Sequence, residues 1–342
     1  MASAFQGVGC NARCTIHPMI EPRIPYVASA DGTQIAYTTI GEGLPLVIPA
    51  NASGGSPVRS PTFARQSRID VALEEPMVNP APLADNHVHS EWSWDAARGD
   101  MDRTCRRAVE LGLRSVAFTE HADWIRGDEA VFDAEGYFEC LERCRARYAS
   151  LRILSGVEMG EPHRHEPRAG ALLRRGFDRV LASVHYIDWK GRTEDAAKEG
   201  FLTPEDAEEM FRWYLGDVLA LLKSDVPFDV LAHLDYPKRY WPDAPRYDET
   251  QFEEEFRTVL REAAKREVAL EVNTTRGREP GRYLCPGAVV LGWWRDEGGR
   301  GVSFGSDAHR PDHVAAGFGS AQGAAAAAGF RADRDPLAFW TR

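Results

Sequence analysis

Short apolar runs alternate with longer segments of helical periodicity from about residue 83 onward. In the segment EDAEEMFRWYLGDVLALLKS, residues 205–224, apolar side chains recur every three or four positions, as one buried helix face requires. The apolar runs are short and have the composition of buried strands. We expect strands at residues 114–121, 151–158, 177–186, 228–235, 268–274 and 300–309, after a first strand that ends in DNHVHS, and helices at residues 100–112, 133–149, 203–223, 249–265, 286–297 and 311–328.

This order of elements, a strand followed by a helix six or seven times, indicates a parallel sheet covered by helices. About 250 residues is the usual length of a closed β/α barrel. We therefore expect an α/β fold, a TIM-like barrel, over residues 83–330, followed by a C-terminal tail or short helix at residues 331–342.

Residues 1–80 follow a different pattern and are expected to form an N-terminal extension, a hairpin and a partly disordered linker. The segment YVASADGTQIAYTTIGEGLPLVIPA alternates as a hairpin does, with ADGT at its turn. The following NASGGSPVRSPTFARQSR has the composition of a linker. This N-terminal extension is open to three interpretations: a remnant, an accessory hairpin or an upstream extension of the reading frame. Because Met77 stands just before the barrel, our hypothesis is that translation begins naturally at or near it and that residues 1–76 are dispensable.

The hairpin also resembles the opening hairpin of the α/β-hydrolases. That fold needs a G-x-S-x-G nucleophile elbow between a strand and a helix. The stretch GGSPV, which lies behind the hairpin, departs from that pattern at its last position. We therefore carry over no activity from this resemblance.

The composition disfavours several classes of function. The chain has a net charge of -11 and no block rich in lysine or arginine, so we expect no nucleic-acid partner. An acidic surface also disfavours anionic membranes, and no segment has the roughly 18 consecutive apolar residues of a membrane-spanning helix. Six cysteines in 342 residues are typical of a reduced protein, and we expect a cytoplasmic location. The sequence leaves the oligomeric state open.

Ionisable residues gather where the predicted strands end. The strand ends are DNHVHS, FTEHAD, SGVEMG, ASVHY, LAHLD and FGSDAH. In a β/α barrel these ends all open on one face, where active sites lie. Six of the ten histidines stand there: His87, His89, His121, His185, His233 and His309. A single histidine at a strand end is commonly structural, but this many together indicate a shared site.

Metal binding explains the residue types at these strand ends. Imidazole nitrogens and carboxylate oxygens are ligands of divalent transition metals, and a carboxylate can bridge two ions. His87 and His89 share one face of their strand, because residues two apart point the same way. Asp307 and His309 repeat that spacing, and Glu158 is placed to bridge. Asp95 offers a further carboxylate.

Together these motifs resemble those of the PHP (polymerase and histidinol phosphatase) superfamily. In that family an HxH follows the first strand and a T-[DE]-H follows the second; a Glu, two single His and a DxH come later. The chain has DNHVHS, FTEHAD, GVEMG, SVHY, AHLD and GSDAHRP in this order. The resemblance covers roughly residues 83–330 and implies a distorted (β/α)7 barrel with a trinuclear metal site.

Carried over by position, the resemblance implies three ion sites, two of which share a glutamate. It places one ion on His87, His89, Glu158 and Asp307, a second on Glu158, His185 and His233, and a third on Asp95, His121 and His309. Some family members have histidine where this chain has Asp95. Zn, Mn and Fe all accept this mixture of ligands, so we expect two or three divalent ions without naming the metal.

The histidinol-phosphatase branch is the most similar, on the strength of FTEHAD, GVE, SVHY, LEVNT and GSDAHRP. The resemblance therefore implies a metal-dependent phosphomonoesterase that hydrolyses L-histidinol phosphate in histidine synthesis, with His185, Glu158 and Asp307 as catalytic residues. Two alternatives stay open. One is a PHP phosphoesterase for another small phosphorylated metabolite, and the other, disfavoured by the acidic charge, is a PHP nuclease.

Four basic residues are candidates to bind the phosphorylated substrate. Arg239 and Arg276 both follow strand ends, and an arginine fork suits phosphate oxygens. Arg164 and His165 lie in EPHRH, shortly after Glu158. The alternative for each of them is a solvated loop position.

Several acidic residues are open to more than one interpretation. Histidinol carries positive groups that Glu120, Asp123 or Asp235 could meet, although nothing in the sequence separates these residues from ordinary surface acids. Asp85, two residues before His87, either orients a ligand histidine or simply begins the first strand.

Overall fold

The computed structural model describes residues 26–28, 34–38, 46–47, 84–242, 246–275, 284–333, 335 and 337–342. The chain divides into two compact units, Met1–Pro76 and Met77–Arg342. In the first unit, β1 (Tyr26–Ala28), β2 (Gln34–Thr38) and β3 (Leu46–Val47) form an antiparallel sheet in that order. The pairing of β1 with β2 falls where the sequence predicts a hairpin.

The second unit is built on one sheet of eight strands. Its strands, in spatial order, are β4 (Ala84–Val88), β5 (Ser115–Ala122), β6 (Arg152–Gly160), β7 (Arg179–Ser183), β10 (Val230–Leu231), β11 (Ala269–Asn273), β12 (Gly301–Gly305) and β13 (Trp340–Thr341). All pairings are parallel except that of β13 with β12. The sheet therefore holds seven parallel strands.

The first parallel strand meets the chain that follows the last one. Val88 forms a parallel bridge with Ala308, and the backbone N–H of Asp307 donates to the carbonyl of His87 at 2.8 Å. These bonds join the carboxyl ends of β4 and β12 and close the ring there. The expectation of a distorted seven-stranded β/α barrel is confirmed.

Asp85 strengthens the same closure with its side chain. Its Oδ1 accepts from the backbone N–H of Ser306 at 3.0 Å, and its Oδ2 accepts from that of Ala315 at 2.9 Å. Asp85 is fully buried. Its carboxylate thus ties β4 to the segment after β12, which answers the question that the sequence leaves open: these two bonds are to backbone amides, and no histidine ring is oriented by them.

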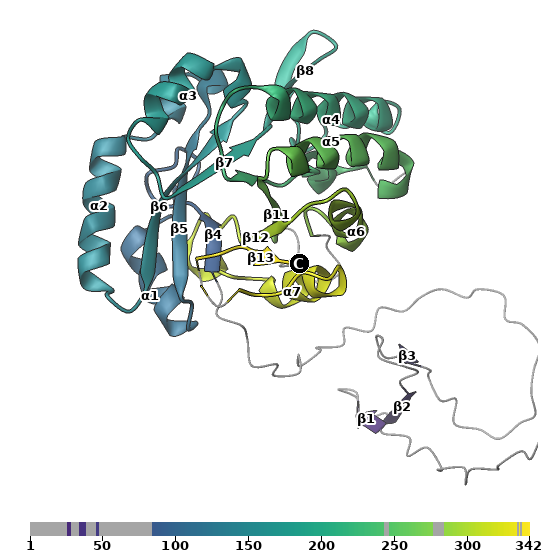
Figure 1. Cartoon of the computed structure of the whole chain (residues 1–342), viewed down its shortest axis with the longest axis horizontal. Coiled ribbons are helices and arrows are strands. Elements are labelled where there is room, and N and C mark those ends of the chain that lie inside the picture. Colours follow the sequence, from purple (N-terminus) through teal and green to yellow (C-terminus); the bar gives the residue numbers. More distant parts are fainter. Residues whose placement is uncertain are drawn as a thin grey trace, which may run out of the picture. The chain divides into compact units, whose positions relative to one another are not determined.

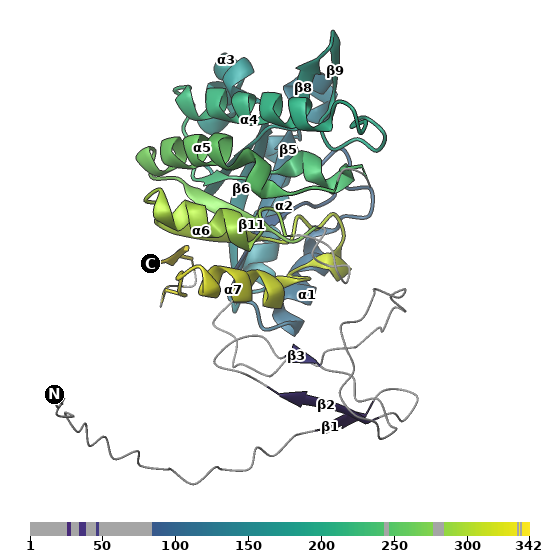
Figure 2. The same cartoon turned by 90° about the vertical axis from the view of Figure 1, so that its right-hand side faces the viewer.

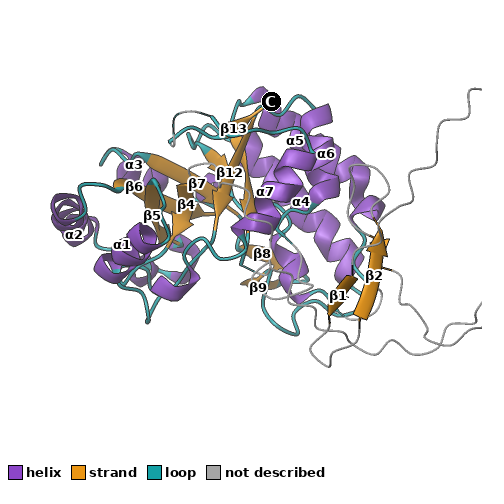
Figure 3. Cartoon of the chain, turned by 90° about the horizontal axis from the view of Figure 1, so that it is seen from below, coloured by secondary structure: helices purple, strands orange, loops and turns teal. Residues whose placement is uncertain are grey.

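Helices cover the outside of the sheet. They are α1 (Met101–Glu110), α2 (Ala134–Arg147), α3 (Glu166–Leu173), α4 (Ala207–Lys223), α5 (Glu253–Lys265), α6 (Ala288–Asp296) and α7 (Phe318–Ala327). In Figure 1, α1 to α3 lie on one side of the strands and α4 to α7 on the other. Figure 2 shows α4 to α7 stacked in chain order, and Figure 3 shows the strands between the two groups of helices. None of the described helices combines the length and the apolar character needed to cross a bilayer.

Local sequence explains where several of these helices begin. The Asp100 side chain accepts from the N–H of Arg103 and caps α1, and Asp133 accepts from the N–H of Glu135 at the start of α2. The inner faces pack large aromatic residues, of which Trp294, Tyr137 and Phe211 are fully buried. This packing holds the strands, and hence their carboxyl ends, in fixed positions.

The structure departs from the predicted elements in four places. The helix α3, between β6 and β7, lies where the sequence predicts none. The predicted strand at 177–186 ends earlier, and β8 (Tyr186–Trp189) turns away to pair with β9 (Arg192–Asp195) as a separate hairpin. The predicted strand at 228–235 is reduced to β10, because the N–H of His233 donates to a side chain, Glu271, instead of to a neighbouring backbone. The last residues form β13, where the sequence predicts a tail or short helix.

One segment of the barrel matches the nucleophile-elbow pattern by sequence alone. GVSFG, residues 301–305, reads G-x-S-x-G, but it coincides with β12. Ser303 is 2 % exposed within that strand and does not stand at a sharp turn into a helix. The segment therefore offers no exposed nucleophile.

Candidate metal centre

All nine sequence-predicted metal ligands lie on one face of the barrel. His87 lies in β4, His121 in β5 and Glu158 in β6, while the others stand in the segments that follow β4, β7, β10 and β12. Three groups of them bring possible ligand atoms within 4.8 Å of one another: His87, His89 and Asp307; His121, Glu158 and His185; and His89, His121 and His309. The structure therefore gathers these residues into one cluster.

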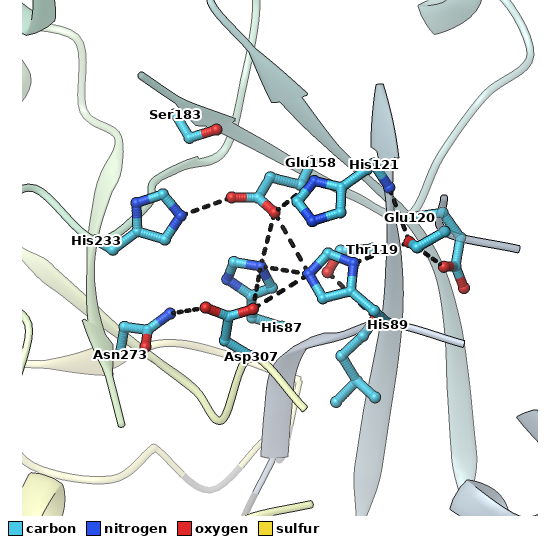
Figure 4. A network of polar contacts seen from close by, with 12 residues as sticks. His87, His89, Thr119, Glu120, His121, Glu158, Ser183, His233, Asn273 and Asp307 are labelled. Carbon is cyan, nitrogen blue, oxygen red and sulfur yellow. Dashed lines mark hydrogen bonds and ion pairs between the residues drawn. The ribbon is translucent and has the colours of Figure 1, made fainter. Parts of the chain in front are cut away.

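Glu158 stands at the middle of the cluster, and its two oxygens face different histidines: Figure 4 shows one oxygen turned to His233 and the other to His87 and His89. Its Oε2 lies 3.0 Å from Nε2 of His87 and 3.4 Å from Nε2 of His89. Its Oε1 lies 2.7 Å from Nε2 of His233 and 3.2 Å from Nε2 of His185. This is the arrangement that a carboxylate bridging two ions requires.

Asp307 completes the group around the first two histidines. Its Oδ1 lies 3.4 Å from Nε2 of His89 and 3.8 Å from Nε2 of His87. The Asp307 backbone has a φ of 51°, a conformation that L-residues rarely adopt. The hydrogen bond from its N–H to the carbonyl of His87 holds it there, so the barrel closure itself places this carboxylate.

A third group lies at the rim of the cluster. Oδ2 of Asp95 is 3.0 Å from Nε2 of His309 and 3.5 Å from Nε2 of His121. The ring of His121 stacks on that of His89 with centroids 4.2 Å apart, and its Nδ1 lies 3.3 Å from Oε2 of Glu158. Asp95 is exposed and His309 is half-buried, whereas the other predicted ligands are buried.

The hydrogen bonds of the ring nitrogens show which side of each ring faces the centre. Four histidines turn Nδ1 to an oxygen outside it: His87 to Glu271 at 2.6 Å, His89 to Ser93 at 3.0 Å, His185 to Asp123 at 2.9 Å and His309 to the carbonyl of Asp307 at 3.0 Å. Carboxylates and carbonyls only accept, and the Ser93 hydroxyl donates to Glu120 at 2.6 Å. Nδ1 therefore carries a hydrogen in these four rings, and Nε2 faces the centre, where it offers a lone pair when the ring is neutral.

The carboxylates of the centre are ionised. Burial opposes the charge of Glu158, but His87 and His185 outweigh it and hold the pKa of Glu158 well below its usual range. Burial also opposes the charge of Asp307, but His87 and Arg239 outweigh it and hold the pKa of Asp307 well below its usual range. The centre therefore presents fixed negative charge inside the protein.

The same carboxylates favour positive charge on their neighbours. Burial lowers the pKa of His185, but Asp123 and Glu158 outweigh it and raise that pKa well above its ordinary value. The pKa of His121 rises to about 9, because Asp123 and Asp95 outweigh its burial. Protons or metal cations can supply this charge, and converging imidazole nitrogens and carboxylate oxygens suit Zn, Mn or Fe. The residues present thus fit a metal centre.

Arg239 borders the centre beside Asp307. Its guanidinium donates to Oδ2 of Asp307 at 2.8 Å and to Oδ1 of Asn273 at 3.1 Å. Thr275 also donates to Oδ2 of Asp307, at 2.9 Å. Arg276, the other predicted phosphate contact of this kind, lies outside the described residues.

The structure places Arg164 against acidic partners. Its guanidinium donates to Asp217 of α4 at 2.5 Å and to Asp188 of β8 at 3.3 Å. These bonds favour a structural role for Arg164 over contact with a substrate. The ring centroid of His165 lies 6.0 Å from that of Trp124. Trp124 belongs to the segment that follows β5.

The three acids considered as partners for a positively charged substrate all have partners within the protein. Glu120 accepts from the hydroxyls of Ser90 and Ser93, both at 2.6 Å. Asp123 contacts His185, and Asp235 accepts from Lys238. Each of the three is buried and engaged by a neighbouring side chain, which favours a structural role over contact with a substrate.

Sequence reasoning missed Glu271. This residue contacts the His87 ring through Oε1 and accepts from the backbone N–H of His233 through Oε2, at 2.8 Å. The signal was present: Glu271 is a charged residue inside VALEVNT, an otherwise apolar strand. A charge buried in such a strand needs a partner, and in a barrel that partner lies inside.

Three comparisons connect this geometry to known proteins. A model of the PHP domain family matches residues 85–275. A protein of Clostridium acetobutylicum named "Probable histidinol-phosphatase" is 28 % identical over 249 residues, covering 69 % of this chain and 90 % of that protein. A protein of Thermotoga maritima with the same name is 29 % identical over 237 residues, covering 69 % and 88 %.

Two crystal structures resemble the fold. Histidinol phosphate phosphatase of Lactococcus lactis, complexed with zinc, L-histidinol and phosphate, is 26 % identical and has a TM-score of 0.64. The match covers 75 % of this chain and 98 % of that one. The putative histidinol phosphatase of Listeria monocytogenes, 19 % identical with a TM-score of 0.58, covers 69 % of this chain and 99 % of its own and supports the fold alone.

Proposed function

Because the chain belongs to the PHP domain family, we propose that it is a metal-dependent phosphomonoesterase that hydrolyses L-histidinol phosphate to L-histidinol and phosphate. The names of the curated relatives and the ligands of the Lactococcus lactis structure support this choice of substrate. The observation that carries the proposal is Glu158, whose two oxygens face two different pairs of histidines. As part of the same proposal, the reaction serves histidine synthesis and takes place in the cytoplasm.

We propose the ligand sets that the family resemblance implies. One ion would be held by His87, His89, Glu158 and Asp307, a second by Glu158, His185 and His233, and a third by Asp95, His121 and His309. Short distances within each set support this division, although the groups of closest ligand atoms also join His121 to Glu158 and His185 and to His89 and His309. The first two groups are buried, and the third lies at the rim. The first two sites are therefore expected to bind tightly, and the third to exchange more readily with solvent.

Divalent cations bound at these groups would neutralise the phosphate dianion and lower the pKa of a bound water toward 7. The protein contributes fixed orientation. Glu158, His185 and Asp307 border the centre from three different strand ends, and we propose them as the catalytic residues. His185 is held by Asp123, and Asp307 is held by Arg239 and Thr275, so these two groups need little reorganisation when a substrate arrives.

Arg239 is the proposed phosphate contact within the described residues. Its guanidinium lies at the edge of the centre and is anchored by Asp307 and Asn273. Anchoring fixes the direction of the remaining N–H groups, which suits a planar fork that binds phosphate oxygens. Arg276 and His165 remain predictions of the same kind, and the two acidic partners of Arg164 make it the weakest of the four.

Substrate selection is proposed to depend on the rim beside His185. There the Arg126 guanidinium lies 3.9 Å from the centroid of the Trp94 ring and donates to the hydroxyl of Tyr186 at 2.5 Å. Trp94 is 41 % exposed, and its ring centroid lies 6.0 Å from that of His121. An exposed aromatic ring at this distance from the centre fits contact with the organic part of a phosphate ester.

The test is phosphate release by the purified chain supplied with Zn²⁺ or Mn²⁺. L-histidinol phosphate is compared with a panel of other small phosphate monoesters and with an oligonucleotide. The proposal expects the highest kcat/KM for L-histidinol phosphate. A higher kcat/KM for another monoester would support the phosphatase activity but contradict L-histidinol phosphate as the substrate. Release of phosphate from none of the compounds would contradict the whole proposal.

A further inference from the structure

We propose that Asp123 and Glu271 are positioning residues that hold His185 and His87 for metal binding, and that Gly160 and Gly305 are needed to leave room for these two pairs. The inference rests on the proposed function in so far as His185 and His87 bind metal. It assigns roles to four residues that are not themselves ligands.

Asp123 fixes the ring of His185 from the protein side. Its Oδ1 lies 2.9 Å from Nδ1 of His185, and its Oδ2 accepts from Nε1 of Trp94 at 2.9 Å. Both oxygens are thus engaged, and the carboxylate is buried. Because Nδ1 carries the hydrogen, Nε2 of His185 points to Oε1 of Glu158, 3.2 Å away. Rotation of the ring would require the loss of the bond to Asp123.

Glu271 acts on two of the ion groups at once. Its Oε1 lies 2.6 Å from Nδ1 of His87, a ligand of the first proposed ion. Its Oε2 accepts from the backbone N–H of His233, a ligand of the second, at 2.8 Å. One buried carboxylate thereby orients a ring in one group and a backbone segment in the other. Partners of this kind fix the tautomer of a ligand histidine and increase its basicity.

A glycine stands beside each of these pairs, at the end of a neighbouring strand. A Cβ at Gly160, the last residue of β6, would overlap Oδ1 of Asp123 and lie 3.2 Å from Nδ1 of His185. A Cβ at Gly305, the last residue of β12, would overlap Oε1 of Glu271 and lie 2.5 Å from Cβ of His87. Each carboxylate could move away only by giving up its bond to the histidine.

Space, and not backbone conformation, explains these two glycines. Neither is among the residues of positive φ, so an alanine could adopt the backbone at both positions. The added methyl group would meet the carboxylate in each case. A matched control is Gly216 in α4, where a Cβ would meet nothing within 4 Å.

The experiment measures metal affinity and stoichiometry in the absence of substrate, by titration of the metal-depleted full chain with Zn²⁺ against a competing chelator. The variants are Asp123→Asn, Glu271→Gln, Gly160→Ala and Gly305→Ala, with Gly216→Ala as control. We expect the first four to lose about 10- to 100-fold in affinity and the control to match the wild type. Circular dichroism identifies any variant that has lost its fold. If a glycine variant does not fold, Asp123→Asn and Glu271→Gln, which keep the size of the side chain, still test the inference.

Double variants separate room for the carboxylate from a general packing effect. If Gly160 matters because of Asp123, then Gly160→Ala should cost little further affinity in a chain that already carries Asp123→Ala. The same relation is expected for Gly305→Ala with Glu271→Ala. Full additivity of either pair would overturn the role of that glycine.

The outcomes also distinguish this inference from the proposed function. Wild-type metal affinity in Asp123→Asn and Glu271→Gln would overturn the inference and leave the phosphatase intact. If the wild-type chain binds metal but releases no phosphate from L-histidinol phosphate, the substrate assignment is contradicted and the inference about metal binding still holds. A wild-type chain that binds no metal would overturn both.

Discussion

The Nε2 atoms of His87 and His89 lie 3.1 Å apart, and both rings donate their Nδ1 hydrogen elsewhere. Two lone pairs at this distance repel each other unless a positive charge lies between or beside them. Oε2 of Glu158 lies 3.0 Å from the first of these atoms and 3.4 Å from the second. This arrangement stabilises a shared cation and is the centre of our account.

Glu158→Gln is expected to abolish activity and to reduce the metal content of the purified chain. The amide keeps the size of the side chain but removes the charge that serves both histidine pairs. Loss of outer partners alone costs about 10- to 100-fold in activity or metal affinity, so loss of the bridging ligand should cost more than about 100-fold. Elemental analysis and phosphate release measure the two effects, and full metal content with normal turnover would exclude the bridging role.

His185→Ala is expected to lose activity while the fold is kept. The ring lies at the carboxyl end of β7 and contacts Glu158 and Asp123, so its loss opens the centre without removing packing from the main core. The variant should show a wild-type circular dichroism spectrum and turnover at background level. Normal turnover would remove His185 from the metal shell.

Arg239→Lys is expected to lower kcat/KM by about 10- to 100-fold with little change in metal content, because an ammonium cannot form the two-pronged contact of a guanidinium. Arg164→Lys provides the comparison, since Arg164 is engaged by Asp217 and Asp188. Its kcat/KM is expected to stay near that of the wild type. An equal loss of kcat/KM in both variants would contradict the structural role that its contacts give to Arg164.

Asp85→Ala is expected to destabilise the barrel. Oδ1 and Oδ2 of Asp85 accept from the backbone N–H groups of Ser306 and Ala315, and the variant leaves both amides without this partner. A buried unpaired group costs about 1–3 kcal/mol, so the free energy of unfolding should fall by roughly 2–6 kcal/mol. Urea unfolding measures this change, and Glu267→Ala, at a side chain that is 72 % exposed, is the control. Equal stability of the two variants would contradict the role of Asp85 in the closure.

A chain that begins at Met77 is expected to fold and to keep its activity. The second compact unit begins at this residue, and the Lactococcus lactis structure is covered over 98 % of its length by 75 % of this chain. The shortened chain is compared with the full chain by phosphate release and thermal unfolding. An insoluble or inactive product would show that residues 1–76 are needed.

Much of the fold was predictable because the spacing of apolar residues within a short stretch of sequence indicates a strand or a helix. The strands that end in FTEH and GVE are found within two residues of their predicted bounds. The β8–β9 hairpin was not predicted, because only Val184 and His185 separate β7 from β8 and no Gly, Pro or Asn marks a turn between them. The early end of β10 coincides with a bond from the backbone N–H of His233 to the side chain of Glu271 on the neighbouring strand β11, which no local sequence pattern predicts.

The candidate site divides in the same way. Strand-end histidines were visible in the sequence because barrel topology brings every carboxyl end to one face, and the structure gathers them as the pattern indicates. The roles of Asp123 and Glu271 depend on pairwise distances between strands. Arg164 was predicted as a substrate contact because it lies near Glu158 in the sequence. That position does not reveal Asp217 of α4 and Asp188 of β8, the carboxylates to which Arg164 donates.

The most direct test of the central claim is phosphate release from L-histidinol phosphate by one preparation in two states, depleted of metal by a chelator and then resupplied with Zn²⁺ or Mn²⁺. The account predicts background release from the depleted chain and recovery of turnover as two or three ions bind per chain. Equal turnover in the two states, or no turnover in either, would contradict it.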